Sequence, residues 1–199
     1  MSGHAMQQQL DTAGHKAVLF VRHGSTAPNL AGLRCGGDLD SPLTELGLRQ
    51  AERLAGELLR LTTPVGVILT SDLQRTRDTA AVISRALGGV PVLVQPAWTE
   101  RRLGDWNLSP IADTQDALLA GRTPPGGESN IDFSRRIFKA ALALRPWLGR
   151  RPLLVGSKGV ARVLGEICGL PERVELDNCS MRRFDLSSVL SDEPAWETS

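Results

Sequence analysis

Short apolar runs alternate with helix-like patterns along this chain, and this alternation limits the fold more than any other feature. The clearest runs are AVLFV at 17–21, VGVILT at 65–70 and RPLLV at 151–155. Short uninterrupted apolar strands are typical of a parallel sheet that is covered on both faces. Two weaker segments, at 91–94 and 181–186, predict two further strands. We therefore expect a sheet that is rich in parallel strands.

Apolar residues at helical spacing fill most of the segments between these runs. A helix is predicted to begin at Thr44, because apolar residues then recur every three or four positions. After the second run, Ser71 and Asp72 predict the cap of another helix, which ends at the glycine pair 88–89. Ser129 predicts the cap of a third, long helix. Each predicted strand except the last is thus followed by a helix or by an irregular segment.

This order of elements predicts an α/β fold, a three-layer α/β/α sandwich with a mostly parallel sheet. Residues 96–127 are irregular apart from a short helix near 113–119, and we expect them to form a short cap. A chain of this length is expected to hold one such domain, which we assign to 15–190. The polar segment 1–14 is predicted to be a disordered tail, and 191–199 a second tail.

Composition excludes several classes of partner. The chain has 23 Lys and Arg against 22 Asp and Glu, a net charge of +1, so no nucleic acid or membrane is expected as a partner. Cys35, Cys168 and Cys179 are widely spaced and odd in number, so neither a disulfide framework nor a metal site is predicted. No apolar run is long enough to span a membrane, and no signal-peptide pattern opens the chain. A cytoplasmic location is therefore expected.

Polar or basic clusters follow three of the predicted strands. They are RHG at 22–24, SDLQR at 71–75 and GSKG at 156–159. Ligands of open α/β sheets bind beyond the carboxyl ends of the strands, where these clusters converge. The sequence therefore predicts one anion-binding site at that edge.

Four motifs, in this order along the chain, resemble the histidine phosphatase superfamily, also called phosphoglycerate-mutase-like. They are RHGST at 22–26, DSPLTELGLRQA at 40–51, SDLQRTRDTA at 71–80 and PPGGES at 124–129. The region between 100 and 124 is short, which is similar to the compact phosphatases of the family rather than to its mutases. The resemblance implies the phosphoglycerate-mutase-like fold with a short cap.

The resemblance also implies a role for each residue of the predicted site. His23 would attack phosphorus and form a phosphohistidine, while Arg22 and Arg75 would bind the phosphoryl oxygens. Glu100 would give a proton to the leaving oxygen, with Asp105 as the rival for this role. Further phosphate or substrate contacts are implied at Asn29, Thr26, Cys35, Gly36, Lys158 and Gly159.

The implied reaction is the hydrolysis of a small phosphorylated metabolite without a metal or an organic cofactor. Glu128, in the last motif, is expected to support a loop rather than to take part in the chemistry. The sequence leaves open whether the protein is a monomer or a homodimer.

One position departs from the family pattern. The second family histidine follows the fourth strand, where this chain has Lys158. Its other two histidines, His4 and His15, lie in the predicted N-terminal tail and cannot replace it. Lysine keeps a positive charge for the phosphoryl oxygens but loses the flat ring and a pKa near neutrality.

Three interpretations of Lys158 remain open at this point. The chain could be a phosphatase whose active site is tuned differently by lysine, or one with a narrow range of substrates. It could be a weakly active or inactive relative that binds phosphoesters. It could also catalyse a different reaction in the same anion pocket, with lysine as a base.

Overall fold

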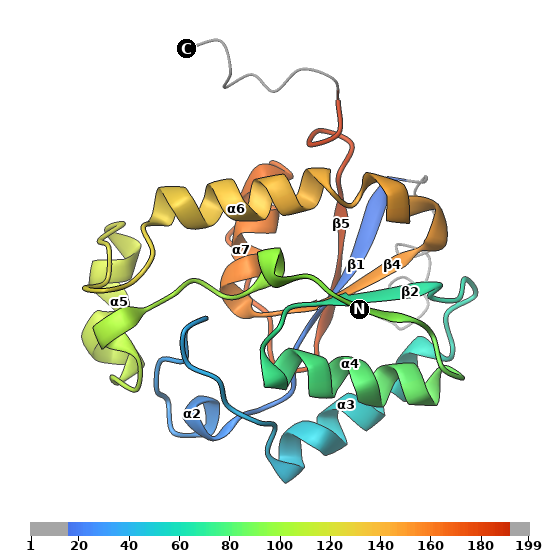
Figure 1. The fold of residues 1–199 in the computed structure, drawn as a ribbon, viewed down its shortest axis with the longest axis horizontal. Coiled ribbons are helices and arrows are strands. Elements are labelled where there is room, and N and C mark those ends of the chain that lie inside the picture. The colour runs from blue at the N-terminus through green and yellow to red at the C-terminus, as the bar shows by residue number, and fades with distance from the viewer. Residues whose placement is uncertain (1–15, 192–199) are drawn as a thin grey trace.

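A computed structural model describes residues 16–191 as a five-stranded sheet with helices on both faces (Figure 1). The strand order is β3-β2-β4-β1-β5, and all neighbours are parallel except the β1–β5 pair. The elements are β1 (Ala17–Arg22), α2 (Ala27–Leu30), α3 (Glu45–Leu58), β2 (Val67–Thr70), α4 (Gln74–Ala86), β3 (Val92–Val94), η1 (Pro96–Trp98), η2 (Gly104–Trp106), α5 (Ile111–Leu119), α6 (Asn130–Leu142), η3 (Arg145–Arg150), β4 (Pro152–Gly156), α7 (Lys158–Ile167) and β5 (Met181–Asp185). The predicted α/β/α fold with a mostly parallel sheet is confirmed.

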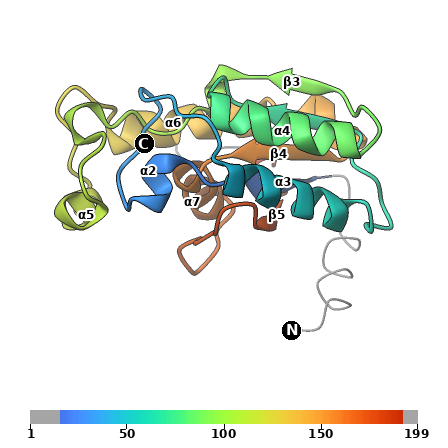
Figure 2. The ribbon, with the colours of Figure 1, turned by 90° about the horizontal axis from the view of Figure 1, so that it is seen from below.

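The central strands bury alternate residues in two separate cores. In β1, Phe20 packs in the core on the α6 and α7 side, whereas Val21 packs in the core on the α3 and α4 side. In β4, Leu154 and Leu153 divide in the same way. Figure 1 shows α6 on one side of the sheet and α3 and α4 on the other, and Figure 2 looks onto the α3 and α4 layer. Because both faces of the sheet are covered, these strands are almost entirely apolar in sequence, apart from Arg22 at the end of β1.

The predicted helix start at Thr44 and the predicted cap at Ser129 are confirmed, each as an N-cap. Thr44 Oγ1 accepts a hydrogen bond from Gly47 N at 3.1 Å and donates one to Ser25 O at 3.0 Å. Ser129 Oγ accepts from Asp132 N at 3.0 Å. A hydroxyl at the N-cap satisfies one of the free backbone N–H groups of the first turn, which is the reason these residues begin helices.

The predicted cap of α4 at Ser71 and Asp72 is wrong. The helix begins after Leu73, whose apolar side chain cannot cap it. The Ser71 hydroxyl is instead bonded to that of Thr76 at 2.7 Å, and the Asp72 carboxylate accepts a hydrogen bond from the Thr99 hydroxyl. Both predicted caps are therefore used in other contacts.

Asp40, from the loop before α3, caps α4 across the fold. Its two carboxylate oxygens lie 2.9 and 3.0 Å from Gln74 N, the first backbone amide of the helix. A carboxylate at a helix N-terminus also interacts favourably with the helix dipole. This contact joins the DSPLTELGLRQA segment at 40–51 to the SDLQR segment at 71–75.

The cap predicted at 96–127 contains η1, η2 and α5, and α5 lies beyond the end of the sheet (Figure 1). The helix begins at Ile111, two residues before the predicted start. Arg34, from the loop between α2 and α3, holds it: Nε donates to Thr114 Oγ1 at 2.8 Å, and Nη2 to Gln115 Oε1 at 2.9 Å. The cap is thus fastened to the loop that follows α2.

The predicted tails at 1–14 and 191–199 lie outside the described residues, apart from Ser191. Among the helices of residues 16–191, none is both long enough and apolar enough to cross a membrane.

Candidate active site

A cavity of about 190 Å³ opens at the carboxyl ends of the neighbouring strands β1 and β4. Seven of the residues that the sequence predicts for the site line it: Arg22, His23, Asn29, Cys35, Glu100, Lys158 and Gly159. Thr26, Gly36 and Arg75 are buried next to it without lining it. The exposed Asp105 does not line it either, which favours Glu100 as the acid.

His23 is held in one orientation by backbone contacts. Its N–H donates to Gly156 O at 2.9 Å, which ties it to the end of β4. The ring atom Nδ1 lies 2.8 Å from Gly24 O. A carbonyl oxygen only accepts, so Nδ1 carries the proton of the neutral ring and Nε2 keeps its lone pair. Nε2 is therefore the nitrogen available for nucleophilic attack.

The surroundings keep the His23 ring neutral. Burial and the positive charge of Arg75, with a smaller effect of Arg22, lower the pKa of His23 from 6.5 to about 3. The hydrogen bond to Gly24 O opposes this shift and does not overcome it. A histidine with this pKa is neutral at physiological pH, as a nucleophile must be.

Two glycines let the turn after β1 pass close to α3. A Cβ on Gly24 would lie 2.5 Å from Gly47 O, and a Cβ on Gly47 would lie 2.3 Å from Ser25 O. Neither position therefore accepts a larger residue without backbone movement. Gly24 N also donates to Thr79 Oγ1 of α4 at 3.1 Å. This close packing fixes the backbone on which the His23 ring is mounted.

Arg22 brings one positive charge to the cavity wall. Its Nη1 donates to Leu176 O at 2.8 Å, and its buried Nε has no hydrogen-bond partner within residues 16–191. Burial lowers the pKa of Arg22, and the charges of Glu100 and Asp177 partly offset that effect. The guanidinium remains charged at neutral pH.

Arg75 has a more structural role than the sequence predicts. The side chain is 1% exposed, and its guanidinium donates to Leu39 O and Gly36 O, each at 3.0 Å. It therefore holds the loop at 35–39 while its charge acts on His23. A direct contact between Arg75 and a phosphoryl group stays a prediction.

Asn29 belongs to a small network beneath His23. Asn178, from the segment before β5, donates from Nδ2 to His23 O at 2.9 Å and to Asn29 Oδ1 at 3.3 Å. Asn29 Oδ1 also accepts from Thr26 N at 3.3 Å. Thr26 is fully buried, so it supports α2 rather than facing the cavity.

Two further predicted contacts, Cys35 and Gly36, lie in the loop that Arg75 holds. The Cys35 side chain lines the cavity, and burial raises the pKa of its thiol. Gly36 N donates to Asn107 Oδ1 at 2.7 Å, so this amide is engaged within the protein. All three cysteines of the chain are free thiols.

Glu100 reaches the cavity from the cap and is held by two backbone amides. Its Oε1 accepts from Arg101 N at 2.7 Å, and its Oε2 accepts from Gly159 N at 2.8 Å. A Cβ on Gly159 would lie 2.2 Å from Glu100 Oε1, so only glycine allows this approach. The turn that carries Lys158 thus also positions the predicted acid.

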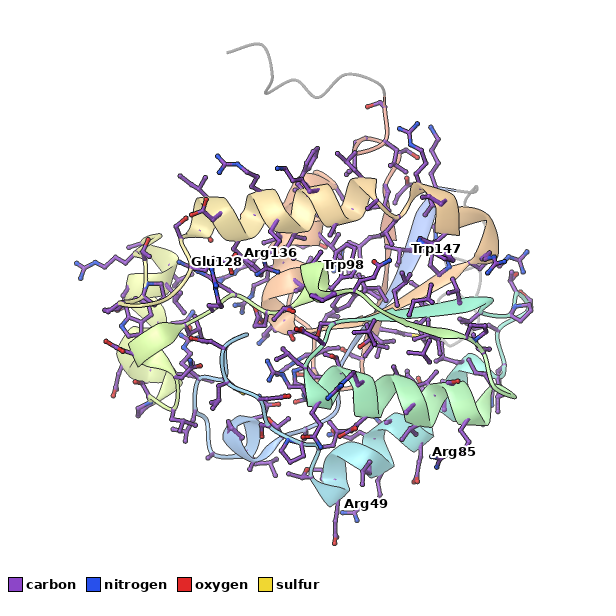
Figure 3. The ribbon with its side chains drawn as sticks, viewed as in Figure 1. Arg49, Arg85, Trp98, Glu128, Arg136 and Trp147 are labelled. Carbon is purple, nitrogen blue, oxygen red and sulfur yellow. The ribbon has the colours of Figure 1, made fainter. Side chains whose placement is uncertain are left out.

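Arg136 and Glu128 lie together at one end of α6 (Figure 3), and Arg136 Nη2 donates to Glu100 O at 3.4 Å. Arg136, on α6, donates to Glu128 Oε1 at 3.0 Å and Oε2 at 2.7 Å. Its Nη1 also donates to Ala97 O at 2.9 Å and Thr99 O at 2.7 Å. Glu128 is 5% exposed and therefore serves as a buried counter-ion in the loop. The predicted supporting role of Glu128 agrees with these contacts.

Lys158 lines the cavity as the first residue of α7. Its Nζ lies 2.6 Å from Glu175 Oε2. The same carboxylate contacts Arg162 and Arg173, which also line the cavity. The predicted contact of Lys158 with a phosphoryl group stays a prediction.

Several site residues were not predicted from the sequence. They are Arg34, Arg136, Arg162, Arg173, Glu175 and Asn178. All of these except Arg173, whose partner Glu175 is two positions away, act through contacts with other parts of the chain, and no motif marks them. Among residues 16–191, no group of three or more His, Cys, Asp or Glu could hold a metal ion.

Comparison with known proteins identifies the family. The sequence model of the histidine phosphatase superfamily (branch 1) matches residues 18–190. A probable phosphoglycerate mutase of Escherichia fergusonii is 37% identical over 190 residues, which cover 84% of this chain and 84% of that protein. Its counterpart in Yersinia pestis is 34% identical over 190 residues, with the same coverage of both chains.

Solved structures give the same result at the level of the fold. A mycobacterial glucosyl-3-phosphoglycerate phosphatase in complex with VO3 is 31% identical, with a TM-score of 0.70, over 84% of this chain and 92% of that one. A phosphoglycerate mutase of Thermus thermophilus is 30% identical, with a TM-score of 0.70, over 86% of this chain and 94% of that one. Together with the neutral, oriented His23 at the strand ends, these matches show that the chain belongs to the histidine phosphatase superfamily, branch 1.

Proposed function

We propose that this protein hydrolyses a small phosphomonoester through a phosphohistidine at His23. The observation that carries the proposal is the neutral His23 ring, whose Nδ1 is bonded to Gly24 O so that Nε2 is free to attack. Arg22 and Glu100 line the same cavity. The family membership and a solved relative that is named as a phosphatase support this type of activity.

The reaction has two steps. Nε2 of His23 attacks phosphorus, the ester P–O bond breaks, and the Glu100 carboxyl gives a proton to the leaving oxygen. Water then attacks the phosphohistidine: the P–N bond breaks, a P–O bond forms, and Glu100 takes up the proton that water loses. Arg22 and Lys158 stabilise the negative charge of the phosphoryl oxygens.

The cavity lining supports a small substrate that carries a phosphate. Positive side chains at Arg34, Arg162 and Arg173 favour an anion, and the apolar side chains of Leu33 and Ile111 offer contacts to the rest of the molecule. Because the positive charges come from side chains of the protein, we expect activity to persist in EDTA. Loss of activity with the chelator and its return with a divalent ion would contradict this mechanism.

The test is a search for the covalent intermediate. Purified protein is assayed against a panel of sugar phosphates, phosphoglycerates and aryl phosphates, then quenched at alkaline pH, where phosphohistidine survives. We expect a phosphorylated peptide that contains His23, and a loss of kcat of more than about a thousandfold in His23→Ala. Turnover by His23→Ala near the wild-type rate would exclude the proposal.

The position of Lys158 favours one second candidate, a phosphoester-binding protein with little turnover. Its ammonium group is paired with Glu175, and the family resemblance implies a histidine at this position. In that case wild-type protein would bind inorganic phosphate without hydrolysing any ester of the panel, and Lys158→His would gain turnover.

A further inference from the structure

Glu175 is the shared partner of three cations that line the active-site cavity. Its Oε2 lies 2.6 Å from Lys158 Nζ. Its Oε1 accepts hydrogen bonds from Nε of Arg162, at 3.1 Å, and from Nη2 of the same residue. Arg173 Nε lies 3.9 Å from Oε1. Lys158, Arg162 and Arg173 all line the cavity that contains His23.

The Glu175 carboxylate is ionised at neutral pH and forms an ion pair with the Lys158 ammonium group. Partial burial acts to raise the pKa of Glu175, but the hydrogen bonds from Lys158 and Arg162 outweigh it, so the pKa lies below its ordinary value. In this arrangement the ammonium faces an anion that belongs to the protein itself. A phosphoryl group in the cavity needs the same ammonium.

The two oxygens of Glu175 are held unequally. Arg162 binds Oε1 with two nitrogens and can neutralise the carboxylate without help from Lys158. The Lys158 side chain is 37% exposed and that of Glu175 is 51% exposed, so their ion pair contributes little free energy. A phosphoryl dianion carries more negative charge than a carboxylate. Lys158 can therefore exchange one partner for the other while Arg162 keeps Glu175 in place.

We propose that Glu175 is a positioning residue for Lys158. It holds the ammonium at the cavity wall when no ligand is bound and releases it to the phosphoryl group of a bound ligand. Glu175 thus competes with the ligand and sets how tightly phosphate binds. The catalytic part of this inference rests on the proposed phosphatase function, whereas the binding part requires no turnover.

The first experiment measures the dissociation constant of inorganic phosphate by calorimetry at low ionic strength. Glu175→Gln removes the competitor, and we expect phosphate to bind about two- to fivefold more tightly, as the small energy of an exposed ion pair implies. Removing any nearby negative charge would also favour an anion. Glu166→Gln measures this general effect, because Glu166 is exposed, lines the cavity and has no contact with Lys158 among residues 16–191.

A double-mutant cycle isolates the contribution of Lys158. Glu175→Gln is repeated in a Lys158→Met background, where we expect its effect to fall to that of Glu166→Gln. Glu172→Gln is the control for the segment, because Glu172 pairs with Arg182 at 3.0 Å and should leave phosphate binding unchanged. An equal effect of Glu175→Gln in both backgrounds, or weaker phosphate binding by Glu175→Gln, would overturn the inference.

The chain has only three lysines, Lys16, Lys139 and Lys158, so the ammonium itself can be followed by NMR of lysine labelled with carbon-13 at Cε. We expect the Lys158 signal to move when phosphate is added to wild-type protein. In Glu175→Gln it should be shifted already without ligand. A Lys158 signal that phosphate does not affect would also overturn the inference.

Kinetics provide a readout that a purely structural role would not give. If the protein turns over, Glu175→Gln should lower KM by the factor found for phosphate and leave kcat within about twofold. A fall in kcat at constant KM would contradict the positioning role. If no phosphohistidine forms at all, the proposed function fails, but calorimetry and NMR still decide the binding part.

Discussion

His23 shows how one residue acquires its chemistry from its neighbours. Its position after the first strand is visible in the sequence, but its protonation state depends on burial and on Arg75, which is 52 positions further along the chain. The backbone carbonyl of Gly24 selects the tautomer. The ring is therefore neutral and oriented without any ligand, as the proposed nucleophilic role requires.

The lowered pKa of His23 predicts a specific dependence of stability on pH. The unfolded chain binds a proton at His23 near pH 6.5, whereas the folded chain does so only near pH 3. Between these values the unfolded state holds more protons, so this group decreases stability as the pH falls, by about 2 kcal/mol between pH 7 and pH 5. His23→Gln should lack this loss when urea unfolding of both proteins is compared at the two pH values. The same pH dependence in both proteins would contradict a buried, neutral His23.

Glu100 carries the second prediction at this scale. If it protonates the leaving oxygen, Glu100→Gln should lower kcat/KM for an alkyl phosphate by about 10²–10⁴. For 4-nitrophenyl phosphate, whose leaving group needs little protonation, the loss should be under about tenfold. The control is Asp105→Asn, an exposed carboxylate that does not line the cavity. Equal losses for both esters would remove Glu100 from the acid role.

Among the elements, α4 begins at a contact with a distant part of the chain. Its first amide is bonded to Asp40, and the loop that contains Asp40 is held in turn by the guanidinium of Arg75 through Leu39 O. Helix and loop thus stabilise each other.

This arrangement predicts which carboxylate caps α4. Asp40→Ala should decrease the free energy of unfolding by about 0.5–2 kcal/mol, the usual cost of a lost N-cap. Asp72→Ala, at the position that the local sequence favours, should cost less. Urea denaturation followed by circular dichroism measures both. A larger loss of stability for Asp72→Ala than for Asp40→Ala would indicate that Asp72 caps the helix.

For the whole molecule, Arg136 connects the α6 layer to the cap. It contacts the buried Glu128 and the backbone of Ala97 and Thr99, next to the residue that reaches the cavity. Helix α6 thereby helps to fix the position of Glu100. Figure 3 shows Arg136 and Glu128 together at the cap end of α6.

Removing Arg136 should therefore affect both stability and activity. Arg136→Met leaves the Glu128 carboxylate buried without its counter-ion, which should cost about 3 kcal/mol of folding free energy. Its neighbour gives the matched control, because Arg135 pairs with the exposed Asp132 and Arg135→Met should cost less than about 1 kcal/mol.

A double variant separates the lost ion pair from the lost packing. Glu128→Leu combined with Arg136→Met removes both charges, so it should be more stable than Arg136→Met alone in urea denaturation. A double variant that is less stable than the single one would show that packing, rather than the unpaired charge, dominates.

The sequence by itself determined the fold class, the family and the position of His23, the proposed nucleophile, at the end of the first strand. These properties depend on short-range patterns: apolar runs that become buried strands, hydroxyls that cap α3 and α6, and motifs that are contiguous in the chain. A pattern of this kind predicts the same local structure whatever the path of the rest of the chain.

Only the tertiary structure decided which groups those residues meet. It paired Asp40 with α4, turned the Arg75 guanidinium to the carbonyls of Leu39 and Gly36, and placed Lys158 against Glu175. The partners are separated by 17 or more positions, and their contacts leave no periodic trace in the chain. Such polar contacts form only when folding brings distant segments together, because a hydrogen bond or ion pair depends on ångström-scale geometry that spacing along the chain does not specify.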